Sequence, residues 1–129
     1  MGDQNELHKR KVHKIAKTVS KIKNDTKIAL LRTQSCCFRD TYKKNIEQID
    51  IHSLDTILEV NIGINPYIVV EPNVSMEQIT DYLLNLDDGP YTLQVTPEFK
   101  HITVGGAING LGIESSSCKY GLFDQTVFK

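Results

Sequence analysis

Residues 103–117 read TVGGAINGLGIESSS and concentrate small residues and hydroxyl groups in one stretch. Gly105, Gly106, Gly110 and Gly112 lie within eight residues, directly after an expected strand end, and three serines follow at 115–117. Glycines this close together either form tight turns or leave backbone N–H groups open to an anion or a planar ring. We interpret the stretch as an anion- or nucleotide-contacting loop, with tight turns as the alternative.

Two familiar phosphate-binding motifs do not match this stretch. Gly105 and Gly110 have the spacing of a Walker A loop, but Leu111-Gly112 replaces its lysine and hydroxyl residue. The glycine order also differs from the G-x-G-x-x-G fingerprint of dinucleotide-binding folds. The sequence therefore supports neither a P-loop nor a Rossmann site.

The composition is that of one small soluble domain. The chain has 129 residues, of which 40% are hydrophobic and 24% are charged, and this length is sufficient for a single core. No apolar run approaches the length of about 20 residues that spans a bilayer, and the N-terminus lacks a signal-peptide pattern. We expect a cytoplasmic protein that is either free or peripheral to an internal membrane.

The net charge of −1 hides an uneven distribution. Residues 1–32 carry nine Lys or Arg against three acidic residues, a balance of +6. Residues 33–129 carry six against thirteen, a balance of −7. This asymmetry indicates two segments with different partners.

The cysteines and histidines form no recognisable metal or disulfide framework. Cys36 and Cys37 are adjacent, Cys118 is distant, and the four histidines are scattered. We therefore expect reduced structural thiols and no metal site. Cys118 in particular is expected to be a small buried thiol.

Residues 1–26 are expected to form a basic amphipathic helix that stops at Asn24-Asp25. Five apolar residues at helical spacing form a narrow stripe among the lysines: Val12, Ile15, Ala16, Val19 and Ile22. The stripe either packs on the following domain or lies on a membrane surface. Nucleic-acid binding is disfavoured, because no aromatic residue lies among the lysines.

The rest of the chain alternates strand and helix patterns. Residues 27–33 suggest a short strand, residues 34–45 a loop, and residues 49–70 two strands around a turn at 63–66. Ser75 and Gln78 form a capping-box pattern that starts a helix with Met76, Ile79 and Leu83 on one face. We expect this helix to stop at 87–90, with Gly89 as a left-handed cap, and a strand at 91–95. The predicted class is α+β.

Several segments of the chain resemble one family in the same order. They are TYKKN (41–45), DTILEVN (55–61), VEPNVSMEQIT (70–80), PE (97–98), TVGGAINGLGIESSS (103–117) and KYGLFDQTV (119–127). These segments resemble FAD-linked oxidoreductases with a vanillyl-alcohol-oxidase-type (PCMH-type) FAD domain, and most closely the delta-24-sterol reductase (diminuto-like) branch. The resemblance implies a basic helix (1–26) followed by a partial PCMH-type FAD-binding domain (27–129).

The resemblance also implies a non-covalent FAD site, with residues 103–106 near the pyrophosphate and ring system. The implied contact residues are Thr103, Val104, Gly105, Gly106, Ala107, Ile108, Asn109, Gly110, Leu111, Gly112, Ile113, Glu114 and Ser115. Tyr120 and Gly121 would set the next turn. In the family, NADPH reduces FAD and the flavin reduces a sterol side-chain double bond.

The sequence also departs from the family pattern. Residues 33–45, where an earlier flavin loop is expected, contain neither glycine nor histidine, and the resemblance stops at Val127. We therefore expect a truncated domain with an open sheet edge and without a substrate domain, so that enzymatic activity is left open. The alternatives are a non-enzymatic remnant or interaction fragment, which associates with a homologue through that edge, and a peripheral membrane-binding module that uses residues 7–23.

Overall fold

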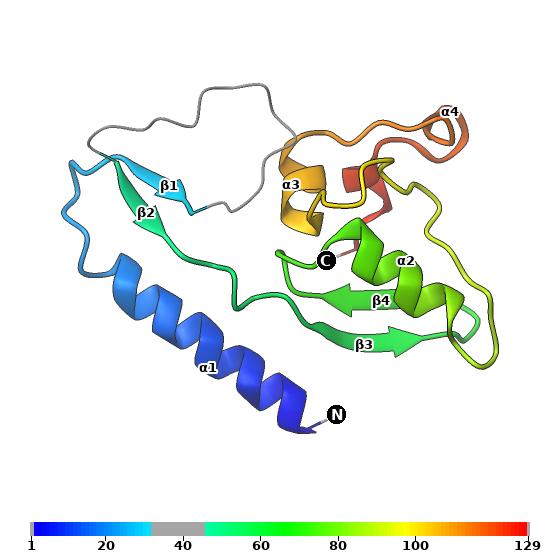
Figure 1. Ribbon diagram of the computed structural model, residues 1–129, viewed down its shortest axis with the longest axis horizontal. Helices are drawn as coiled ribbons and strands as arrows, with labels where there is room; N and C mark the ends of the chain where they lie inside the picture. The colour runs from blue at the N-terminus through cyan, green and yellow to red at the C-terminus, as the bar shows by residue number, and fades with distance from the viewer. Residues whose placement is uncertain (1, 32–45, 129) are drawn as a thin grey trace.

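The computed structural model describes residues 2–31 and 46–128, and within them helices and small sheets are mixed (Figure 1). The helices are α1 (Gly2–Val19), α2 (Met76–Leu84), α3 (Val104–Asn109) and α4 (Ser117–Tyr120), followed by the 3-10 helix η1 (Phe123–Thr126). The strands are β1 (Ile28–Leu30), β2 (Glu47–Ile49), β3 (Ile57–Asn61) and β4 (Tyr67–Val70). The predicted α+β class is therefore confirmed, whereas the loop expected at 34–45 lies outside the described residues.

The strands form two separate pairs among the described residues. β1 runs parallel to β2, with Ile28 opposite Glu47, and β3 runs antiparallel to β4, with Asn61 opposite Tyr67. The β3–β4 pair is a hairpin closed by residues 62–66, where Gly63 and Pro66 favour a reversal of the chain. The predicted strand, turn and strand are thus confirmed.

Helix α2 begins where the capping box predicts. The Ser75 hydroxyl accepts from the Gln78 N–H at 3.2 Å, and the Gln78 side chain accepts from the Ser75 N–H at 2.8 Å. These two bonds satisfy N–H groups that have no partner inside the helix. Met76, Ile79 and Leu83 are buried, so the predicted apolar face is also confirmed.

The core lies between α2, the β3–β4 hairpin and the α3–η1 region. Its buried members are Val74, Met76, Ile79, Leu83, Val95, Ala107 and Phe123. Residues from the hairpin and from 86–108 pack around this cluster. The glycine-rich stretch is therefore attached to the core through Ala107.

Two predictions after α2 are wrong. The helix ends at Leu84 with Asn85 as its cap, and Gly89 is not among the glycines with positive φ. No strand forms at 91–95, although Val95 is fully buried and the Tyr91 N–H donates to the Leu83 carbonyl at 3.1 Å. Prolines at 90 and 97 flank this short segment, and it packs on the core without a neighbouring strand in the described part of the chain.

Helix α1 is shorter than predicted and does not dock through its apolar stripe. It ends at Val19, well before Asn24. Val12 and Val19 remain 42% and 39% exposed, and Ile15 is half-buried. The prediction that this stripe packs on the domain is therefore wrong for most of its length, and polar contacts hold the helix instead. No helix in the described residues is both long and apolar enough to cross a bilayer.

Candidate functional site

The first part of the glycine-rich stretch is a short helix and not the expected loop. Thr103 caps α3, because its hydroxyl accepts from the Gly106 N–H at 3.2 Å and its carbonyl accepts from the Ala107 N–H at 2.8 Å. A threonine three residues before the N–H that donates to it is a helix-start signal, and the neighbouring glycines made this signal hard to recognise in the sequence.

The N–H groups at the start of α3 are already used by the protein. The Val104 N–H donates to the Val74 carbonyl at 2.9 Å, and the Gly105 N–H donates to the Pro72 carbonyl at 2.8 Å. Together with the bonds to Thr103, all four N–H groups from 104 to 107 have protein acceptors. In this conformation, these amides are not available to a pyrophosphate.

Close packing explains two of the glycines. A Cβ at Gly105 would lie 3.1 Å from the Pro72 carbonyl oxygen, so a side chain would push α3 away from the turn before α2. A Cβ at Gly112 would lie 3.3 Å from Phe123 Cβ and 3.4 Å from Pro97 Cγ. Glycine at both positions therefore avoids close contacts that a side chain could make only by displacing its neighbours by a few tenths of an ångström.

The second part of the stretch, residues 109–115, is more open to solvent. Leu111 is 57% exposed and adopts a φ of 51°, which is the left-handed region that non-glycine residues rarely occupy. Ile113 is 70% exposed. Glu114 fixes the segment, since its N–H donates to the Ser117 hydroxyl at 2.9 Å and its carboxylate accepts from the Glu98 N–H at 2.7 Å. The segment therefore exposes two apolar side chains, those of Leu111 and Ile113, to solvent.

The structure therefore brings the thirteen predicted site residues into one continuous unit with two unlike halves. Ala107 is buried, and Val104 and Ile108 pack against the core. Asn109 is exposed, but its side-chain amide donates to the Gly105 carbonyl at 2.7 Å. The first half thus anchors the stretch, and the second half faces solvent.

The residues after this unit give one confirmation and one correction. Gly121 follows α4 with a φ of 82°, so the predicted turn glycine is confirmed. Cys118 is exposed and its thiol donates to the Ser115 carbonyl at 3.3 Å, so the prediction of a buried thiol is wrong. Four-residue helix α4 is too short to bury this side chain.

A buried carboxylate that sequence reasoning missed joins α1 to the hairpin. Glu71 is 1% exposed. Its Oε1 accepts from His8 Nδ1 at 2.8 Å, and its Oε2 accepts from Lys11 Nζ at 2.9 Å and from the Thr56 N–H at 2.8 Å. Lys11 also donates to the Thr56 hydroxyl at 2.8 Å. We call this cluster of His8, Lys11, Thr56 and Glu71 the Glu71 latch.

The latch keeps Glu71 ionised. Burial of the carboxyl raises its pKa, but the hydrogen bonds from His8, Lys11 and Thr56 outweigh burial and lower the pKa to about 2. A signal was present in the sequence, because His8 and Lys11 are three residues apart and so share a helix face. Their partner is 60 or more residues away, which no local pattern reveals.

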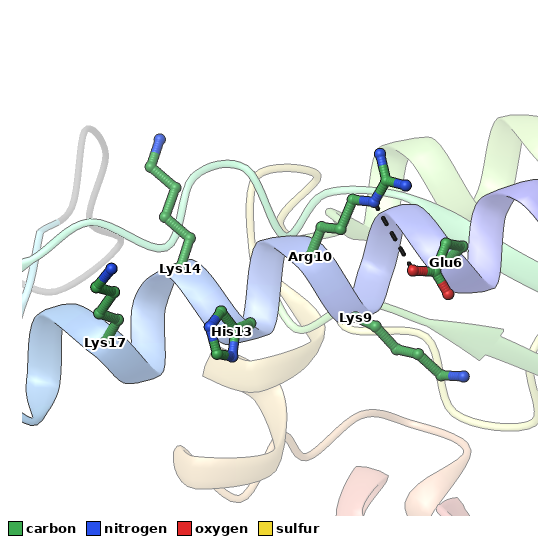
Figure 2. Close-up of a pocket in the computed structure, with 6 residues that line it drawn as sticks. All are labelled: Glu6, Lys9, Arg10, His13, Lys14 and Lys17. Carbon is green, nitrogen blue, oxygen red and sulfur yellow. Dashed lines mark ion pairs between the residues drawn. The ribbon is translucent and has the colours of Figure 1, made fainter.

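Helix α1 presents a second, outward set of basic residues. Figure 2 shows these side chains extending from the near side of the helix, with the rest of the chain behind. Together with Glu6, these basic residues line an open pocket of about 530 Å³: Lys9, Arg10, His13, Lys14 and Lys17. We call Lys9, Arg10, His13, Lys14 and Lys17 the outer basic face. All five are exposed, and Arg10 Nε lies 3.8 Å from Glu6 Oε1.

A second pocket of about 340 Å³ lies where α2 meets residues 96–100. Its lining residues are Met76, Glu77, Thr80, Asp81, Thr96, Pro97, Glu98 and Lys100. Lys100 Nζ is 3.2 Å from Glu77 Oε1. Neither pocket is lined by residues 103–115. Within residues 2–31 and 46–128, no three His, Cys, Asp or Glu side chains are grouped to hold a metal ion.

Curated proteins from animals and plants match the chain. The Delta(24)-sterol reductase homolog of Caenorhabditis elegans is 42% identical over 84 residues, and the human Delta(24)-sterol reductase is 48% identical over 84 residues. Each of these matches covers 65% of this chain and 15% of the relative. The Pisum sativum Delta(24)-sterol reductase is 52% identical over 58 residues, which is 45% of this chain and 10% of that protein.

This chain is a relative of the delta(24)-sterol reductases. The predicted resemblance to that branch is thereby confirmed. The matched part spans about 15% of the length of these two animal reductases. No protein-family model and no solved structure matches the chain.

Proposed function

We propose that this chain is part of a delta(24)-sterol-reductase-like flavoprotein and contributes a flavin-contacting surface to it. The observation that carries the proposal is an identity of 42% to 49% with animal reductases over 84 residues. Such identity implies a shared fold for the matched residues, and the motifs from Val70 to Val127 resemble the PCMH-type FAD domain. The proposed domain covers residues 27–129, with α1 preceding it.

The geometry of the glycine-rich stretch fits FAD only in part. The amides of α3 do not fit a pyrophosphate, because protein carbonyls and Thr103 already accept from them. Residues 109–115 do fit contact with a flat ring, because Leu111 and Ile113 expose apolar surface there. We therefore place the non-covalent FAD contact on residues 109–115, while residues 103–108 anchor that segment to the core.

The proposed reaction of the whole protein is the reduction of a sterol side-chain double bond with NADPH as the electron source. FAD would supply the hydride chemistry when bound. The residues of this chain would position the ring and exclude water from one of its faces. We assign no proton donor among them.

An FAD titration of the purified chain, followed by flavin fluorescence and visible absorption, tests the proposal. We expect saturable binding that Ile113→Asp weakens at least about tenfold, since the loss of one buried aliphatic contact costs about 1.5 kcal/mol or more. Ile113 is 70% exposed, so its replacement leaves the fold intact.

Ile64→Asp is the matched control, because Ile64 is fully exposed in the β3–β4 turn and distant in sequence from the stretch. It should bind FAD like the unmodified chain. Circular dichroism establishes that each protein is folded. A folded chain that does not bind FAD, or an equal loss of binding in both variants, contradicts the proposed contact and favours a non-enzymatic interaction fragment.

A further inference from the structure

One side of α1 contacts the domain, and the other side is exposed to solvent. His8 and Lys11 point to the domain, where they hold the Glu71 carboxylate at 2.8 and 2.9 Å. The outer basic face lies on the other side of the helix, because residues 10, 14 and 17 recur at helical spacing that is offset from 8 and 11. One side is therefore committed to the fold, and the other is free to meet a partner.

Two acidic residues act on the outer basic face within the described part of the chain: Asp50 and Glu6. Hydrogen bonds from His52 lower the pKa of Asp50, and Lys14 helps to lower it. Glu6 is the one acidic residue that lines the same pocket, and its 3.8 Å pairing with Arg10 is an exposed contact of little strength. The rest of the molecule has the opposite charge balance, with thirteen acidic against six basic residues beyond residue 32. An anionic surface would attract α1 and repel the domain, which favours one orientation.

We propose that the outer basic face of α1 docks this protein on the surface of an anionic lipid bilayer. A bilayer is flat and extended, and a straight helix of 18 residues along one side of the molecule can place its lysines on it together (Figures 1 and 2). The first 31 residues contain no Phe, Tyr or Trp that could stack on a nucleic-acid base.

The latch determines how the helix lies on the lipid. To bury its apolar stripe, α1 would have to roll and pull Lys11 and His8 away from a fully buried carboxylate. Val12 and Val19 follow His8 by four and eleven residues, so they lie on the latch side of α1 and away from the outer basic face, and attachment is electrostatic rather than insertional. Such attachment is reversible and is screened by salt, since the Debye length falls from about 10 Å at 0.1 M to about 3 Å at 1 M.

Co-sedimentation of the full chain with vesicles tests this docking. We expect binding to phosphatidylcholine vesicles that contain about 30% phosphatidylserine, no binding to phosphatidylcholine alone, and loss of binding at high salt. Lys9→Glu with Lys14→Glu should reduce partitioning at least about 25-fold, because each cation contributes about fivefold near an anionic leaflet.

The matched control is Lys21→Glu with Lys23→Glu, which makes the same charge change at exposed residues beyond the end of α1. It should reduce partitioning only a few-fold. Circular dichroism verifies folding of both pairs. Absence of binding to the anionic vesicles, equal loss in both pairs, or tighter binding to duplex DNA than to vesicles would overturn the proposal. Lipid docking and flavin binding are measured separately, so failure of one leaves the other intact.

Discussion

At the scale of single residues, Asp124 departs from the rule that buried polar atoms are paired. Its Oδ1 is buried and has no hydrogen-bond partner among the described residues, although η1 is otherwise well connected to the α3 region. An unpaired buried carboxylate oxygen destabilises a fold by about 1–3 kcal/mol. The atom lies in the segment that resembles the reductases.

We predict that Asp124→Asn raises the free energy of unfolding by about 1 kcal/mol in the isolated chain, because a neutral amide is less costly than a carboxylate where one oxygen is buried without a partner. Urea denaturation measures the change. Asp87→Asn removes the same charge from an exposed site and should change stability by less than about 0.5 kcal/mol. A destabilised Asp124→Asn chain would mean that Oδ1 does have a donor.

At the scale of elements, the attachment of α1 depends on a few polar groups rather than on a broad apolar face. Lys11 is 16% exposed and reaches Glu71, the Thr56 hydroxyl and, at 3.8 Å, Asp55. Removing one partner of a buried ion pair costs about 3–5 kcal/mol, because the other charge is left buried. The helix should therefore be sensitive to changes at this one position.

We predict that Lys11→Met, which keeps an unbranched side chain of similar length, lowers the free energy of unfolding by about 3 kcal/mol. It should also accelerate hydrogen exchange along α1, because the helix loses its main attachment. Lys9→Met is the control on the outer basic face and should alter neither quantity appreciably. Equal effects of the two substitutions would show that the latch does not hold the helix.

At the scale of the whole molecule, Glu71 links folding to pH. Its pKa falls from an ordinary 4.5 to about 2 on folding, so the folded state binds fewer protons than the unfolded state in acid. The contribution of ionised Glu71 to the free energy of unfolding is present in full above about pH 5 and is lost as the pH falls towards about 2. A shift of this size corresponds to about 3 kcal/mol.

We predict that the free energy of unfolding of the unmodified chain falls as the pH is lowered from about 5 to 2, with a slope that Glu71→Gln reduces. The stability gap between the two chains should narrow over this window. Urea titrations at a series of pH values measure both curves. Parallel curves from pH 5 to 2 would contradict the role assigned to this carboxyl.

The sequence predicts those features of the fold that depend on residues close together in the chain, and it does not predict features that depend on tertiary contacts. The capping box of Ser75 and Gln78 and the β-branched run of β4 act over a few residues, and both predictions are confirmed. Residues 91–95 have a strand pattern, but a strand also needs a neighbour, and the sequence does not specify one. The glycines of α3 were interpreted as a loop because their packing on Pro72 is a tertiary contact.

The candidate site shows the same division. The composition of residues 103–115 and their resemblance to the family indicate a site there. The division of this stretch into an anchored half and an exposed half depends on hydrogen bonds to the carbonyls of residues 72 and 74, which the sequence does not reveal. The Glu71 latch was not predicted, because each of its residues is ordinary in its local context.

The Glu71 latch also has a consequence for the order of folding. The β3–β4 hairpin and α2 form from contacts between residues close in sequence, whereas the latch closes loops of 60 and 63 residues. Closing long loops costs entropy that only later contacts repay. We therefore expect the hairpin and α2 to assemble before α1 docks, and α1 to detach from the domain before the other described elements unfold.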